Sequence, residues 1–186
     1  YTRPNRLLKE DIERAKVKLH VGYGHTSHGS QLTNGYAEPG FPELNIFANN
    51  GGLGIDLPDN IFAFNHGGTA GALDMCHNVA HLGASDLGSP DRTAWANGTR
   101  AFLATHPLTN VIMWSWCGQA DTTEANINTY LNLMSQLESE FPNVKFVYMT
   151  GHLVGTGLNG NLHLRNEQIR NYCRLNNKIL YDFEDI

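Results

Sequence analysis

The segment 24–30, Gly-His-Thr-Ser-His-Gly-Ser, brings together side chains that can do chemistry. His25 and His28 flank Ser27 there. A serine hydroxyl needs a base to become a nucleophile, and imidazole suits that role because its ordinary pKa lies near neutral pH. The segment therefore predicts a nucleophile, Ser27, with His25 and His28 as supporting groups. The competing interpretation is a polar loop that carries incidental histidines.

An alternating apolar run before this segment predicts the strand that would position it. Val17, Leu19, Val21 and Tyr23 recur at every second residue, which is the spacing that places side chains on one face of a strand. The run stops at Gly24. Because ligand sites in α/β sheets lie beyond the carboxyl ends of the strands, Ser27 is expected at a functional edge.

Further strands and helices alternate along the chain. Strands are expected at 61–64, 110–116, 144–150 and 178–183, and helices at 7–16, 69–82, 89–105, 121–141 and 163–176. Ser89-Pro90 is a typical helix start, and Asp121 with Glu124 has the spacing of a capping box. The alternation predicts a three-layer α/β fold, with a parallel sheet of about five strands and helices on both faces. The length of 186 residues suits one domain, 1–186.

Three other strand ends also carry polar groups that could complete a hydrolytic site. Gly67 can offer a backbone N–H and Gln119 a side-chain amide to a developing oxyanion. His152 follows the strand 144–150 and is the best candidate for the base. The competing interpretation of Gln119 is a loop or helix-cap amide. We expect His25, Ser27, Gly67, Gln119 and His152 to meet at one edge of the sheet.

These segments resemble the sequence blocks of the SGNH/GDSL hydrolases, a family of esterases and lipases on a flavodoxin-like sheet. Segment 24–29 stands where that family has its Gly-Asp-Ser block, and 65–71 looks like the block whose glycine amide lines the oxyanion hole. Segment 118–121 occupies the place of the Gly-x-Asn-Asp block. The helix from Arg165 and the strand after it look like those before the family's final Asp-x-x-His.

Three departures from the family pattern limit the resemblance. His25 replaces the family's Asp, and Thr26 stands at the position of the family's Ser, so Ser27 is one place late. Ala120 replaces the family's Asn. No Asp-x-x-His follows the last predicted strand before Ile186. Either the sequence is cut short at its C-terminus, another histidine serves, or the domain is a non-catalytic relative.

The resemblance implies a serine-dependent esterase of the SGNH type, acting on small-molecule or carbohydrate esters without a cofactor. The alternative is a binding or structural domain that keeps the fold but lacks a complete triad. A third interpretation is a metal-binding protein, because the chain has nine histidines and His77 and His81 are spaced i, i+4. No third ligand stands beside that pair, and a catalytic zinc needs three, so no metal is expected.

The composition of the chain indicates which partners and which surroundings to expect. The net charge of −5 and the lack of a basic stripe argue against nucleic acid, and no apolar run is long enough to cross a membrane. The start at Tyr1 indicates a processed product or a fragment; with the low lysine content, it favours an extracellular protein. Cys76, Cys117 and Cys173 allow one disulfide or none. The segment 31–60 is expected to cover the site.

Overall fold

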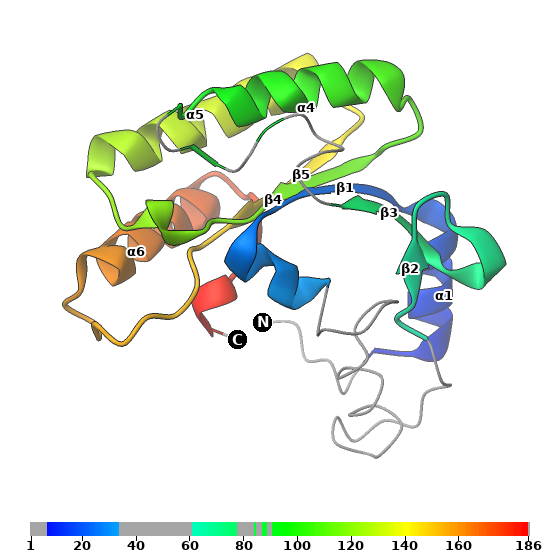
Figure 1. Cartoon of the computed structure of the whole chain (residues 1–186), viewed down its shortest axis with the longest axis horizontal. Coiled ribbons are helices and arrows are strands. Elements are labelled where there is room, and N and C mark those ends of the chain that lie inside the picture. Colours follow the sequence, from blue (N-terminus) through cyan, green and yellow to red (C-terminus); the bar gives the residue numbers. More distant parts are fainter. Residues whose placement is uncertain (1–6, 34–60, 78–83, 85–86, 89–90, 186) are drawn as a thin grey trace.

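Parallel strands form one twisted sheet at the centre of the computed structural model, which describes residues 7–33, 61–77, 84, 87–88 and 91–185 (Figure 1). The described strands are β1 His20–Gly24, β2 Phe64–Asn65, β3 Leu73–His77, β4 Val111–Trp114, β5 Lys145–Met149 and β6 Ile179–Tyr181. Their order is β2-β3-β1-β4-β5-β6, and every neighbouring pair is parallel. The order β3-β1-β4-β5-β6 is the flavodoxin-like 2-1-3-4-5 arrangement, and β2 adds one strand at its edge.

Helices cover both faces of this sheet. They are α1 Lys9–Lys18, α4 Ala94–Thr105, α5 Glu124–Glu140 and α6 Asn161–Leu175. Figure 1 shows α4 and α5 on one side of the sheet and α1 on the other, where α1 contacts β3. Helix α5 packs against both α4 and α6. The predicted three-layer α/β class is confirmed, with six strands instead of about five.

Buried aromatic rings build the core between the sheet and the helices α4 and α5. Trp95 of α4, Trp114 of β4 and Trp116 are at most 1% exposed. Their indole N–H groups donate to Arg92 O, Thr99 Oγ1 and Met149 O respectively, so the buried donors are satisfied. Trp114 and Trp116 are therefore core residues, not exposed platforms for sugar stacking.

The first strand is shorter than its alternating pattern predicts. Helix α1 continues to Lys18, so Val17 lies on a helix and is 80% exposed, and β1 begins only at His20. At the other end of β1, a Cβ on Gly24 would come within 2.3 Å of the Trp114 ring. A glycine is required at that position because the indole packs directly on the backbone.

The helix expected at 69–82 is wrong. Residues Leu73–His77 form β3, which pairs in parallel with β1 along its length. Gly67, Gly68, Ala70 and Gly71 have positive φ angles and prevent a helix from starting there. The apolar spacing that suggested a helix face instead serves a short buried strand, whose period cannot be distinguished over so few residues.

Helices α5 and α4 each begin later in the chain than predicted. Asp121 does not cap α5; Thr123 does, since its side chain accepts from the backbone N of Asn126 at 3.2 Å. The start at 89–90 lies outside the described residues, as does most of the segment 31–60, while α4 begins at Ala94. Asp91 Oδ1 accepts from the backbone N of Ala94 at 3.1 Å and supplies the capping interaction there.

Cys76, Cys117 and Cys173 are free thiols, so none of the possible pairings forms. Within the described parts of the chain, no helix has the length and apolar character needed to cross a membrane.

Candidate functional site

The carboxyl ends of β1 and β4 form the topological switch point of the sheet. The strands β2 and β3, which follow β1 in the chain, lie on one side of β1, and the next strand, β4, lies on its other side. Flavodoxin-like sheets bind ligands at this point, because the connections leave the two strand ends in opposite directions. Segments 25–30 and 115–120 follow these two ends.

The turn after β1 presents Ser27 to solvent on a strained backbone. Ser27 is exposed and has φ 20°, a value rare for a residue with a side chain. The Ser30 hydroxyl donates to the Ser27 carbonyl, and the Tyr23 hydroxyl donates to Gly29 O at 2.8 Å. A Cβ on Gly29 would approach Ser115 Oγ to 1.9 Å, so this turn packs tightly against the segment after β4.

His28 and His152 lie face to face beside this turn. Their ring centroids are 3.7 Å apart with an interplanar angle of 9°. Burial, and secondarily the neighbouring His28, lowers the pKa of His152, so His152 is neutral near pH 7 and can accept a proton. Among the described residues, Nδ1 of His152 is buried without a hydrogen-bond partner.

Cys117 joins this histidine pair from the end of β4. Its Sγ lies 3.5 Å from Nδ1 of His28. We did not identify Cys117 as a site residue from the sequence, although it directly follows the apolar run 110–116, which predicted a strand. The sequence cannot show which strand ends become neighbours, and this decides the contact.

Gln119 lies beside Cys117, but its side chain turns back to the chain. Its Oε1 accepts from the backbone N of Cys117 at 3.1 Å. The side-chain carbonyl thus holds the loop, as the competing interpretation expected, and the amide nitrogen is the part of Gln119 that could serve an oxyanion.

His25 points to a different neighbour, His77 at the end of β3. Their Nε2 and Nδ1 atoms are 3.1 Å apart, and Thr33 Oγ1 lies 3.4 Å from the same Nε2. His25 is 5% exposed, and burial, then the adjacent His77, lowers the pKa of His25 to about 4. His25 is therefore a neutral, buried group that supports the turn from below.

The structure does not bring Gly67 to this edge. Its backbone N donates to Asp74 Oδ1 at 2.8 Å, and Asp74 pairs in register with His20, the first residue of β1. Ser27 follows the opposite end of that strand. The expected meeting of Gly67 with Ser27 and Gln119 is wrong, because the helix expected after Gly67 is a strand that starts at the amino end of the sheet.

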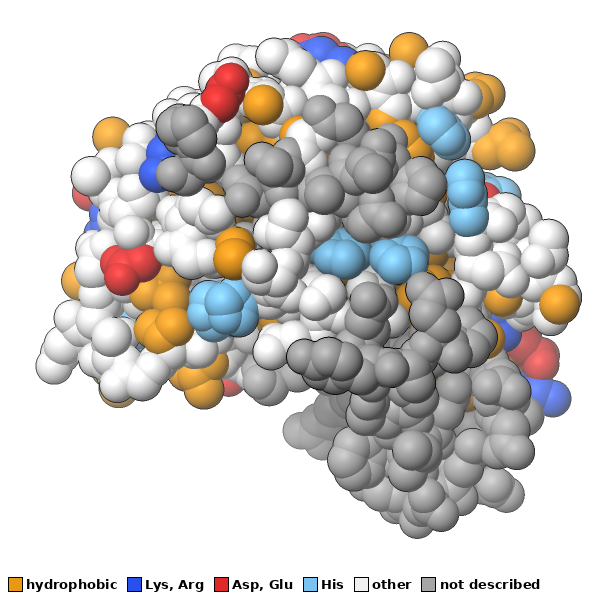
Figure 2. Space-filling view, viewed as in Figure 1, with side chains coloured by type: hydrophobic (Ala, Val, Ile, Leu, Met, Phe, Trp, Pro, Cys, Tyr) orange, Lys and Arg blue, Asp and Glu red, His pale blue; other side chains and the backbone are white. Residues whose placement is uncertain are grey.

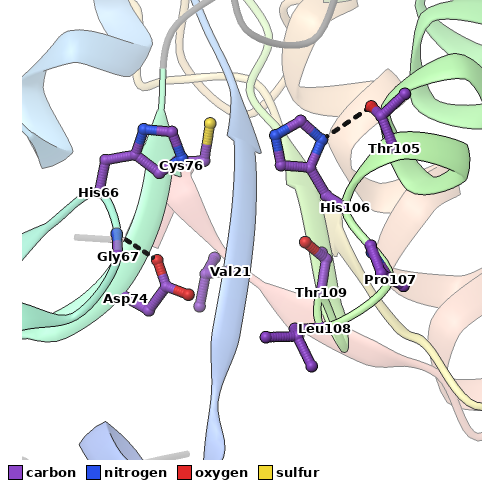
Figure 3. Close-up of a pocket in the computed structure, with 10 residues that line it drawn as sticks. All are labelled: Val21, His66, Gly67, Asp74, Cys76, Thr105, His106, Pro107, Leu108 and Thr109. Atoms are coloured by element: carbon purple, nitrogen blue, oxygen red, sulfur yellow. Dashed lines mark hydrogen bonds between the residues drawn. The ribbon is translucent and has the colours of Figure 1, made fainter.

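Gly67 instead lines a separate cavity of about 270 Å³ (Figure 3). His66 and His106 face each other across it, with ring centroids 6.3 Å apart and the thiol of Cys76 between them. Asp74 at its base accepts from Gly67 and lies 2.7 Å from Nδ1 of His20. Neither this cavity nor the position of His106 in its wall was expected from the sequence.

Histidines appear at several separate places on the face shown in Figure 2, not in one patch. Among the described residues, no group of three or more His, Cys, Asp or Glu side chains is arranged to hold a metal ion. The pair His77 and His81 is not tested, because His81 lies outside the described residues.

The acidic residue that follows the last strand is committed to an ion-pair network. Asp182 accepts from Nε and Nη2 of Arg170 at 2.7 and 2.6 Å and from Thr150 Oγ1 at 2.9 Å. Arg170 also reaches Glu184, which lies 3.0 Å from Nδ1 of His163. Asp182 therefore does not orient His152 as the acid of a catalytic triad would.

Comparison with family models, with curated proteins and with solved structures found no match to this chain.

Proposed function

We propose that this protein is a serine-dependent ester hydrolase that acts at the carboxyl ends of β1, β4 and β5. The observation that carries the proposal is the strained, exposed Ser27 after β1, next to the stacked rings of His28 and His152. Strained backbone at a strand end is typical of residues held in position for reaction. Small-molecule and carbohydrate esters are the substrate classes that the SGNH-like blocks suggest.

Each proposed role follows from ordinary acyl-transfer chemistry. Ser27 Oγ attacks the acyl carbon while its proton passes to the imidazole of His152, and the carbonyl oxygen becomes an oxyanion. Collapse breaks the bond to the alcohol, which leaves with that proton. Water then attacks the acyl-serine in the same way, so the carboxylic acid is released and Ser27 is restored.

Exposure and hydrogen bonding support His152 as the base better than His25. A base must be neutral before it accepts a proton and must reach the substrate side. His152 is half-buried, whereas His25 is buried and uses Nε2 on His77 and Thr33. The amide nitrogen of Gln119 is the proposed side-chain donor to the oxyanion, since its oxygen is already bonded to Cys117 N.

The proposal can be tested with fluorophosphonate labelling and with a panel of aryl acetates and acetylated oligosaccharides. Ser27→Ala should abolish labelling and lower hydrolysis at least about 10³-fold, because the nucleophile is removed. Ser139→Ala is the matched control, since Ser139 is an exposed serine on α5. Equal hydrolysis by Ser27→Ala and the wild type would overturn the proposal.

Two observations favour a second candidate, a binding domain without catalysis. Among the described residues, the Ser27 hydroxyl makes no hydrogen bond to an imidazole, and Asp182 is held by Arg170. Such a domain would bind acetylated oligosaccharides at the same edge without turning them over. Calorimetric binding that Ser27→Ala leaves unchanged, together with no hydrolysis by the wild type, would identify it.

A further inference from the structure

Cys117 and His28 form a thiol–imidazole pair across the switch point of the sheet. Sγ and Nδ1 are 3.5 Å apart, within the range used for hydrogen bonds that involve sulfur. The two residues follow β4 and β1, which are direct neighbours with Gly24 opposite Trp114. The contact is therefore positioned by the rigid sheet, even though both residues lie in loops.

Both partners are held in orientation by other groups. The face of the His28 ring stacks on His152 at 3.7 Å, so its nitrogens lie at the edge of the stack and one of them reaches Cys117. The backbone N of Cys117 donates to Gln119 Oε1. Side chains from the ends of β1, β4 and β5 thus meet in one cluster.

The other two cysteines are more deeply buried than Cys117. Cys76 on β3 and Cys173 on α6 are at most 4% exposed, whereas Cys117 is half-buried. Burial raises the pKa of Cys76 to about 11 and that of Cys173 to about 12. Both therefore remain thiols, which do not act as nucleophiles.

We propose that Cys117 is a covalent modification site that reacts with low-molecular-weight disulfides, with His28 as the group that accepts the thiol proton. Nδ1 of His28 takes the proton and leaves a thiolate, which attacks one sulfur of the disulfide. A new S–S bond forms as the old one breaks. Cys117 is oxidised, and the departing thiolate is the reduced product, which takes up a proton. This inference does not depend on ester hydrolysis.

Oxidised glutathione and iodoacetamide are suitable probes for the full chain. Peptide mass spectrometry after a short exposure at about pH 6.5 should find the adduct on Cys117 at least about tenfold faster than on Cys76 or Cys173. The two buried thiols serve as internal controls in the same sample. Equal rates at the three cysteines would overturn the proposal.

A variant of His28 separates the imidazole effect from simple exposure. His28→Gln should slow the alkylation of Cys117 at about pH 6.5, because the group that accepts the thiol proton is removed. His163→Gln should not, since His163 lies near Glu184, away from this pair. An unchanged alkylation rate of Cys117 in His28→Gln would overturn the assignment of His28.

A second measurement covers the case in which His28→Gln fails to fold. The ultraviolet absorbance of thiolate at about pH 6.5 can be compared between the wild type and Cys117→Ser, and the difference isolates Cys117. A thiolate signal at that pH supports the pair, whereas its absence contradicts the proposal.

Discussion

Two histidines of the segment after β1, His25 and His28, each pair with a histidine from another strand end, and the two pairs differ in how their rings meet. The rings of His25 and His77 meet through their nitrogens, 3.1 Å apart, while His28 and His152 meet through their faces, with centroids 3.7 Å apart. Each pair is within 9° of parallel. In the first pair, Nε2 of His25 and Nδ1 of His77 are used on each other, whereas the stacked pair leaves its ring nitrogens for other partners, as with Nδ1 of His28 and Cys117.

Burial reinforces this difference. His25 is 5% exposed and contacts the Tyr23 ring at 4.6 Å between centroids, so it belongs to the packing beneath the turn. His28 and His152 are half-buried, and His28 already contacts Cys117. His25 and His28 are only three positions apart in the chain. His25 is thus suited to support the turn, whereas His28 is suited to proton transfer.

The largest expected effect is on ester hydrolysis, and it distinguishes a substitution in the stacked pair from one in the buried pair. His152→Asn should lower ester hydrolysis about 10²–10⁴-fold, because asparagine can hydrogen-bond but cannot accept the proton. His25→Asn should lower the activity of the folded fraction far less, since it removes support and not the base. Rates on aryl acetates, corrected for the folded fraction by circular dichroism, check both. A larger loss in His25→Asn would reverse the assignment.

The next effect concerns Gln119, the proposed oxyanion donor. Gln119→Glu keeps an oxygen for the bond to Cys117 N but removes the amide donor, so it should lower kcat about 10²–10³-fold. Gln119→Ala should do the same and should also loosen the loop. If Gln119→Glu retains full kcat while Gln119→Ala loses stability, the side chain serves only the loop.

The smallest effect is a dependence of folding stability on pH, which arises from the buried His25. The pKa of His25 is about 4 in the folded protein and 6.5 as the ordinary value. Between these values the unfolded chain binds a proton that the folded chain does not, so stability is complete above about pH 6.5 and falls towards pH 4. The loss is at most roughly 3 kcal/mol.

Urea unfolding of the wild type and His25→Asn between pH 7.5 and 4.5 measures this term. The difference in free energy of unfolding should shrink as the pH falls, because the variant lacks the titrating group. His152→Asn should change the slope less, since His152 is only half-buried. Parallel pH profiles for the wild type and His25→Asn would show that the buried pair carries no proton linkage.

Much of the architecture could be predicted from local patterns. The runs that became β4, β5, α5 and α6 have clear periods, and each element lies within a few residues of its expected place. Ser27 and His28 follow a strand end, as the glycine-rich segment indicated. The position of Gly67 could not be predicted, because the five residues of β3 are too few to distinguish a strand from a helix before β1 pairs with them.

The sequence by itself determined the α/β alternation and the strand ends at which reactive side chains occur, because period and turn residues act over short stretches of chain. The tertiary structure decided which of those ends are neighbours. Strand order put Cys117 beside His28, which stacks on His152, and it placed Gly67 near the opposite end of β1. Strand order depends on contacts between residues far apart in the chain, and no local pattern records those contacts.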